Sequence, residues 1–355
     1  MTKIRYGIVG AGVIANLMAR AFTEDRDSVA VALADPNIEA ARKLAPTLGV
    51  TRVVADYREL LADPGIDAFY IATPPFLHRP MALAALQAGK HVCVEKPFML
   101  TQAEVREVIA AQQAAPRLKV TCNSSRFHNS GTARRARAMV AGGELGALYR
   151  VHFEHVTSPP KPGTTLPPWR NDPAKNGGGI SFDWGVYDLD WLSFVLGERF
   201  RPRIVFATLG NYFPLTAERV PPCLDVDGRV CAEIICDDGL TIHWERRAAE
   251  HGPDRHNIEL RGTRAGLDTC FVPMGAKQGL HRFAYVGAEG MQAAALDESL
   301  PDWQETMVFT IRDFSRAILD DRDPSNTPAH SLRIHGILDA VHASARTRQA
   351  VRIED

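Results

Sequence analysis

Cysteines are few in this sequence, and their spacing indicates no disulfide pairs. No two of the six lie in a CxxC motif: they are Cys93, Cys122, Cys223, Cys231, Cys236 and Cys270. Small secreted domains instead carry regularly spaced cysteines that form a disulfide framework. We therefore expect reduced, mostly buried thiols and a cytoplasmic protein.

Long apolar runs and a marked excess of either charge are also missing. No stretch of about 18 uninterrupted apolar residues occurs, and "MTKIRYGIVG" at the start contains no apolar leader with a cleavage site. Lys and Arg number 41 against 42 Asp and Glu, which gives a net charge of -1. We expect neither export nor a membrane span, and no binding to nucleic acid. A small molecule is the partner that this composition favours.

The length of 355 residues exceeds what one hydrophobic core usually organises, which predicts two domains. In the first third, short apolar runs alternate with helical stretches, as in a parallel sheet wrapped by helices. We predict strands at Ile4–Val9, Val29–Ala34, near Val53, and at Ala68–Ala72, His91–Val94 and Leu118–Thr121. The first helix is expected at Ile14–Phe22. Residues 1–122 should thus form a doubly wound, Rossmann-type domain.

A glycine motif lies between the first strand and the first helix. In "GIVGAGVIA", Gly10 and Gly12 permit a tight turn and a close approach of pyrophosphate, and Val13 and Ile14 open the helix whose amides would hold the phosphates. Asp35 ends the second strand, where an acid accepts from the adenosine ribose and repels a 2'-phosphate. The motif therefore predicts NAD. Arg42, one turn into the next helix, leaves NADP possible, and Asp35 could instead simply start the turn "DPN".

The carboxyl ends of the fourth and fifth strands are the next place to search, because ligands of such sheets lie there. These ends carry "ATPPFLH" and "VCVEKPF". The candidate cofactor-binding residues in them are Thr73, Pro74, His78, Glu95 and Lys96. The Lys96–Pro97 bond can be cis. Alternatively, Glu95 and Lys96 are a solvated pair, and His78 only starts a helix.

Three glycines precede an acid and a phenol in "GGGISFDWGVYDLD". If the segment is one helix, Asp183 and Tyr187 are four residues apart and share a face, as a proton-handling pair would. The alternative is a helix start capped by Ser181, with Trp184 and Trp191 in the core. His152 and His155 lie three apart on an expected strand, hence on opposite faces, so we expect no metal shared by these two and no metal site.

Six segments together resemble the Gfo/Idh/MocA oxidoreductase family in order and spacing, over nearly the whole chain. They are "GIVGAGVIA", "IATPPFLH", "GKHVCVEKPF", "RFHNSGTARRARAMVAGGELGALYRV", "WRNDPAKNGGGISFDWGVYDLD" and "IELRGTRAGL". The resemblance implies that residues 123–355 form an α+β domain on an open, mostly antiparallel sheet. It also implies that this sheet supports a homodimer or homotetramer.

The resemblance further implies roles for particular residues. Lys96 matches the catalytic lysine of the family and Asp183 its aspartate, whereas Tyr187 stands where histidine is common. We expect a Lys-Asp-Tyr proton relay, with Arg126, Trp169 and Arg170 as further substrate-binding residues.

The implied activity is NAD(P)-dependent hydride transfer at a secondary hydroxyl or ketone of a sugar, inositol, related polyol or glycoside. The alternatives are an enzyme that retains its cofactor, an NAD-dependent glycosidase, and a non-catalytic nicotinamide-binding regulator.

Overall fold

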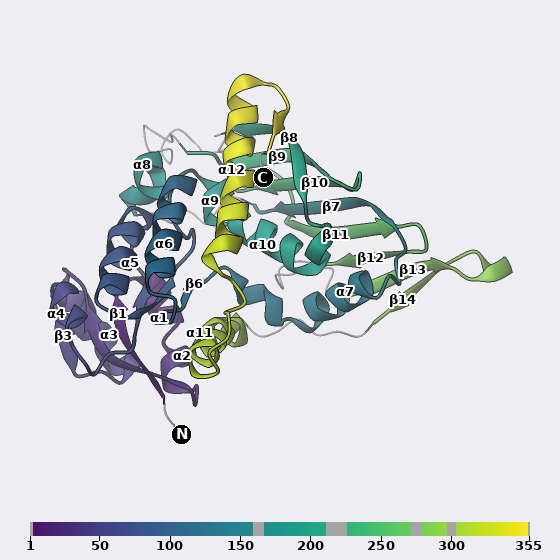
Figure 1. The fold of residues 1–355 in the computed structure, drawn as a ribbon. Coiled ribbons are helices and arrows are strands. Elements are labelled where there is room, and N and C mark those ends of the chain that lie inside the picture. Colours follow the sequence, from purple (N-terminus) through teal and green to yellow (C-terminus); the bar gives the residue numbers. More distant parts are fainter. Residues whose placement is uncertain (1–2, 159–166, 211–225, 271–278, 297–302, 354–355) are drawn as a thin grey trace. The chain divides into compact units, whose positions relative to one another are not determined.

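The computed structural model describes residues 3–158, 167–210, 226–270, 279–296 and 303–353 (Figure 1). The chain divides into two compact units. The first consists of Met1–Arg126 and Asp302–Arg333, and the second of Phe127–Pro301 and Ile334–Asp355. The division predicted at residues 122 and 123 differs from these units chiefly because residues 302–333 pack with the first.

The first unit contains a six-stranded parallel sheet in the order β3-β2-β1-β4-β5-β6. Its strands are β1 (Ile4–Val9), β2 (Ser28–Ala34), β3 (Arg52–Val54), β4 (Ala68–Ile71), β5 (His91–Val94) and β6 (Val120–Cys122). The order reverses between β1 and β4, as in doubly wound nucleotide-binding folds. The predicted Rossmann-type fold is confirmed, and the strands lie where the apolar runs placed them.

Helices cover both faces of this sheet. They are α1 (Val13–Leu17), α2 (Arg20–Thr23), α3 (Ile38–Leu48), α4 (Arg58–Leu61), η1 (Pro75–Leu77), α5 (His78–Gln87), α6 (Gln102–Ala114) and α11 (Trp303–Leu319). The single helix expected at Ile14–Phe22 is two short helices, because the chain turns at Met18 and Ala19.

Successive residues of these strands point alternately to the two faces of the sheet, and a separate hydrophobic cluster lies on each face. On β4, Tyr70 joins the cluster that packs against α11, whereas Phe69 joins the cluster beneath α5 and α6. Two arginines of α11 pair with acids that precede β2, Arg312 with Asp25 and Arg316 with Asp27. These contacts explain why α11, distant in sequence, belongs to the first unit.

The second unit contains a nine-stranded sheet in the order β14-β13-β12-β11-β7-β10-β9-β8-β15. Its strands are β7 (Leu148–Val156), β8 (Pro202–Gly210), β9 (Arg229–Cys236), β10 (Thr241–Arg247), β11 (Arg255–Gly262), β12 (Ala265–Thr269), β13 (His281–Tyr285), β14 (Met291–Ala295) and β15 (Val351–Arg352). Among these described strands, β7 and β10 form the one parallel pair. The predicted open, mostly antiparallel sheet is confirmed.

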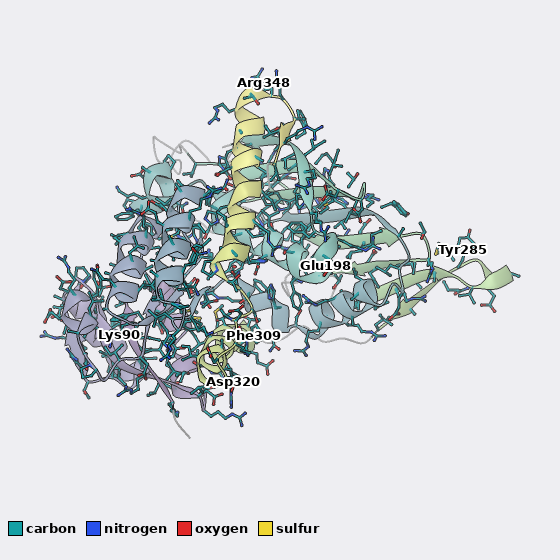
Figure 2. All side chains as sticks on the ribbon, in the orientation of Figure 1. Lys90, Glu198, Tyr285, Phe309, Asp320 and Arg348 are labelled. Carbon is teal, nitrogen blue, oxygen red and sulfur yellow. The ribbon has the colours of Figure 1, made fainter. Side chains whose placement is uncertain are left out.

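Helices pack on one face of this sheet, which we call the inner face. The remaining elements are η2 (Ser125–Asn129), α7 (Gly131–Ala141), η3 (Pro168–Asn171), α8 (Pro173–Asn176), α9 (Ile180–Asp183), α10 (Gly185–Leu196), η4 (Gly197–Arg199), η5 (Gly287–Glu289) and α12 (Pro328–Thr347). On the outer face, side chains stay partly exposed: Phe206 is 46% exposed, and Tyr285, labelled on β13 in Figure 2, is 74% exposed.

No helix in the described ranges is long and apolar enough to cross a bilayer. The five cysteines in these ranges form no disulfide, and four of them are buried. Cys223 lies outside the described residues, as do residues 159–166 of the long loop between β7 and η3.

Candidate active site

The two glycines in the turn after β1 have different surroundings. Gly10 has a φ of 102°, and a Cβ there would lie 2.6 Å from the carbonyl oxygen of Ala72. Gly12 lies at the N-terminus of α1, and a Cβ there would meet nothing within 4 Å. Gly10 is therefore required by the fold itself, whereas Gly12 leaves space beside the exposed backbone. Val13, the next residue, is 79% exposed.

Asp35 is fixed by two backbone amides at the end of β2. Its Oδ2 accepts from Ala11 N at 2.7 Å, and its Oδ1 accepts from Asn37 N at 2.7 Å. Since a carboxylate oxygen can accept more than one hydrogen bond, capacity remains for a ribose hydroxyl. Arg42 is exposed and pairs with Glu39 at 3.1 Å. The carboxylate thus lies directly beside the glycine turn, as a ribose ligand must.

His78 joins the turn after β4 to the turn after β5. Its Nε2 lies 2.9 Å from the carbonyl oxygen of Thr73, and its Nδ1 lies 2.9 Å from that of Pro97 and 3.2 Å from that of Phe98. The ring is fully buried, and burial lowers its pKa although the carbonyl groups oppose this shift. His78 therefore positions two loops, and its predicted contact with a cofactor stays a prediction. Thr73 and Pro74 are half-buried at the same edge.

Glu95 is the centre of a buried polar cluster. Its Oε1 accepts from the Tyr70 hydroxyl and from Asn123 Nδ2, each at 2.6 Å, and forms an ion pair with Arg126. Its Oε2 accepts from the backbone amide of Lys96 at 3.2 Å. Burial, followed by the Glu95 charge, raises the pKa of Tyr70. Glu95 is therefore no solvated surface group.

Arg126 has a different environment from the one expected of a substrate ligand. It is 2% exposed, and its guanidinium faces the Glu95 carboxylate. Direct contact with substrate stays a prediction. Lys96 itself is half-buried, and the Lys96–Pro97 peptide bond is cis, as proposed from the sequence.

Asp183 in the second unit is held by Arg170. Arg170 Nη1 donates to Asp183 Oδ2 at 2.6 Å, and both side chains are partly exposed. The Arg170 guanidinium also lies over the Trp169 ring, 5.1 Å from its centroid. The structure thus brings together three of the predicted site residues, Trp169, Arg170 and Asp183.

The expectation of one helix through Asp183 and Tyr187 is wrong. Helix α9 ends at Asp183 and α10 begins at Gly185, because Trp184 between them has a φ of -113°. The spacing of four residues therefore does not place the two side chains on one continuous helical face. Tyr187 is 2% exposed, and its ring packs edge-on against Phe127 with centroids 5.3 Å apart.

Gly178 and Gly179 allow close packing against Asp227, a residue that no sequence motif singles out. A Cβ at Gly179 would lie 1.8 Å from the Asp227 carbonyl oxygen. The Asp227 carboxylate accepts from the amides of Gly179 and Ser181, each at 2.8 Å. Ser181 also donates its hydroxyl to Asp227, so it does not cap the helix. Asp227 therefore fixes the start of α9, which carries Asp183.

A second buried ion pair fastens α10 to the inner face of the sheet. Asp188 accepts from Trp244 Nε1 at 2.9 Å and from Arg246 Nε at 2.5 Å. Next to Arg246, His155 Nδ1 lies 3.0 Å from His256 Nδ1. Burial, and then the charge of Arg246, strongly lowers the pKa of His155. These partners lie on separate strands, so no local motif predicts them.

Comparison with known proteins gives two family matches. Residues 4–123 match the oxidoreductase family with an NAD-binding Rossmann fold, and residues 133–268 match the GFO/IDH/MocA C-terminal domain. The chain is 32% identical over 276 residues to trans-1,2-dihydrobenzene-1,2-diol dehydrogenase of Bos taurus, covering 76% of each chain. It is 33% identical over 196 residues to 1,5-anhydro-D-fructose reductase of Ensifer adhaerens, covering 55% of this chain and 57% of the relative.

Among solved structures, a levoglucosan dehydrogenase in complex with NADH has a similar fold. The TM-score is 0.87 at 22% identity, and all of both chains is covered. The two domain matches and the extended similarity to the bovine dehydrogenase agree with the Rossmann sheet and the open second sheet. The protein belongs to the Gfo/Idh/MocA family of NAD-binding oxidoreductases.

Proposed function

We propose that the protein transfers hydride between a nicotinamide cofactor and a secondary hydroxyl or ketone of a sugar, inositol, related polyol or glycoside. The observation that carries this proposal is the common sheet edge of the first unit. There the glycine turn follows β1, Asp35 follows β2, and Lys96 follows β5. Relatives named for anhydrofructose and for a dihydrodiol support a polyhydroxylated substrate.

The residues at this edge fit a dinucleotide. Bound NAD would supply the hydride acceptor or donor. Gly10, Gly12, Val13 and Ile14 would hold the pyrophosphate, because backbone is accessible there and no Cβ intrudes at Gly12. Asp35 would accept from the adenosine ribose. The remaining proposed cofactor-binding residues are Thr73, Pro74, His78, Glu95 and Lys96.

The proton of the substrate hydroxyl needs an acceptor within hydrogen-bond reach. We assign this step to Tyr187, and we propose that the Lys96 ammonium favours its phenolate in the complex with cofactor and substrate. Asp183 would keep Lys96 charged and directed at the substrate oxygen. In the reverse direction, the phenol or the ammonium returns the proton. The Arg170 contact supports this role for Asp183, because the guanidinium orients the carboxylate.

Trp169 and Arg170 are proposed to bind the substrate. An aromatic face and guanidinium donors suit the apolar and polar faces of a sugar ring. Arg126 is also proposed to bind the substrate, and its guanidinium pairs with Glu95. The homodimer or homotetramer and the cytoplasmic location also stay predictions.

The test is a panel of aldoses, ketoses, inositols and glycosides, followed by nicotinamide absorbance with NAD and with NADP. On the best substrate, Lys96→Met and Tyr187→Phe should each lower kcat by about 10²–10⁴-fold. Fluorescence titration should show unchanged cofactor affinity in Tyr187→Phe, whereas Lys96→Met also removes a proposed cofactor contact. The double variant should lose little more than either single one, because the residues act as a unit. Tyr149→Phe, an exposed tyrosine, is the control.

Near-normal turnover in both single variants would refute the relay. Failure of every substrate to change the absorbance in the steady state, with product still formed, would instead support an enzyme that retains its cofactor. Absence of product with tight cofactor binding would support a regulator.

A further inference from the structure

The outer face of the nine-stranded sheet carries a compact group of histidine and glutamate side chains. His152 on β7 and His243 and Glu245 on β10 each offer a ligand atom, and these atoms lie within 4.8 Å of one another. On β10, Trp244 and Arg246 alternate with them and face α10 on the inner side. The group is therefore separate from Asp183 and Tyr187.

Strand register fixes this group in place. His243 is the direct partner of His152 in the parallel pairing of β7 and β10. Their ring centroids are 4.9 Å apart, with the planes at 68°. Glu245 is two residues further along β10, so it points to the same face. Backbone hydrogen bonds between β7 and β10 thus hold the three candidate ligand groups together, and all three lie on strands.

A fourth residue orients one of the imidazoles. Glu233, the partner of His243 on β9, places its Oε1 2.5 Å from His243 Nδ1. Since a carboxylate only accepts, Nδ1–H donates to Glu233, and Nε2 is the ring nitrogen left to bind a metal. This Nε2 lies 3.9 Å from Glu245 Oε2, too far for a hydrogen bond. A cation about 2.0–2.2 Å from each atom fits such a gap, and a carboxylate on the far nitrogen is typical of histidines that bind metals.

The surrounding charges permit a cation here. Glu259 lies opposite His152 in the sheet, and its charge is balanced by Arg261 at 3.0 Å and Arg150 at 3.7 Å. Arg247 pairs with Glu245 through Oε1 and is shared with Glu250, so Oε2 remains directed at His243.

We propose that His152, His243 and Glu245 bind one divalent cation of the Zn²⁺, Co²⁺ or Ni²⁺ class, with Glu233 as a positioning residue. Two imidazoles favour these ions over Mg²⁺ and Ca²⁺, which prefer oxygen ligands. The ion joins β7 to β10, the parallel pair among the described strands of this sheet, and so stabilises the second unit. This inference does not depend on the proposed hydride transfer.

The experiment uses the full-length, tag-free chain after treatment with a chelator. Titration calorimetry with Zn²⁺ should give one site per chain, and Zn²⁺ should raise the melting temperature as any ligand selective for the folded state does. His152→Gln, His243→Gln and Glu245→Gln should each weaken binding by more than about tenfold, and Glu233→Gln by about 10- to 100-fold. His281→Gln removes another histidine of the outer face, on β13, and should leave binding unchanged.

Circular dichroism verifies that each variant is folded. The absorption spectrum of Co²⁺ added to the unmodified chain gives a readout that needs no variant. We expect the spectrum of a cobalt ion bound by protein ligands. The proposal is overturned if no ion binds above the level of a chelator control, if cobalt keeps the spectrum of the hydrated ion, or if the folded ligand variants bind as tightly as His281→Gln.

Discussion

Glu95 and Arg126 form an ion pair in which both side chains are almost completely enclosed, at 4% and 2% exposure. Tyr70 and Asn123 donate to the same carboxylate oxygen. The loop that carries Lys96 is thereby attached to the end of the Rossmann segment. Breaking such a pair leaves a buried charge without its partner, which costs far more than the loss of a surface ion pair.

Arg126→Met should lower the free energy of unfolding by about 3–5 kcal/mol, because Glu95 is then left in a buried site without its cationic partner. Urea denaturation measures this effect. The double variant with Glu95→Gln should recover part of the loss, since the isolated charge is gone. Arg106→Met, at an exposed position of α6, should change stability by no more than about 0.5 kcal/mol. A loss below about 1 kcal/mol in Arg126→Met would contradict the importance of this pair.

Gly10 and Gly12 should respond differently to alanine. Gly10→Ala should destabilise the fold, since its φ is positive and a Cβ would collide with the Ala72 backbone. Gly12→Ala should leave the melting temperature nearly unchanged but weaken NAD binding at least about tenfold, because the added methyl group enters the space left for pyrophosphate. Thermal denaturation and NAD titration separate the two effects. Equal NAD affinity in Gly12→Ala and the unmodified chain would exclude this position for the phosphates.

Asp35→Ser should change cofactor preference. Loss of a hydrogen bond to a charged group is worth about 1.5–3 kcal/mol, so kcat/KM for NAD should fall by roughly 10- to 150-fold. Activity with NADP should rise relative to NAD, because the carboxylate no longer repels a 2'-phosphate. Asp320→Asn, at an exposed position, should leave the ratio unchanged. An unaltered ratio in Asp35→Ser would show that Asp35 only organises the turn through Ala11 and Asn37.

Stability should fall as the pH drops below about 6.5, partly through His155. Burial and Arg246 lower its pKa in the folded state, so the unfolded chain binds a proton first as the pH falls. The stabilising contribution is therefore complete above the unfolded pKa and is lost below it, by up to about 1.4 kcal/mol per pH unit. Urea denaturation from pH 7.5 to 5 should show a shallower decline for His155→Gln.

Phe153→Leu is the matched control for this pH effect. Phe153 lies on the same face of β7 and is fully buried, but it has no titratable group. Its substitution should lower stability equally at every pH. If His155→Gln and the unmodified chain decline in parallel, the titration of His155 contributes nothing.

Local sequence predicted most strands of the first unit, because the pattern of apolar residues within a segment is what makes that segment a strand. Apolar runs with the period of a strand placed β1 at Ile4–Val9 and β5 at His91–Val94, and both agree with the structure. Strands β13 and β14 of the second sheet lack such a pattern, because both carry exposed residues and few buried ones. The break at Trp184 was also missed, since the sequence around it is apolar enough to continue a helix.

The sequence by itself determined the Rossmann topology, the glycine turn and the acid at Asp35, because these depend on spacing within one strand-turn-helix unit. Only the tertiary structure decided that Glu95 is buried against Arg126, that Asp227 fixes the start of α9, and that His152 meets His243 and Glu245. Each of these contacts joins residues far apart along the chain. Their proximity is set by sheet order and register, which no local pattern of residues encodes.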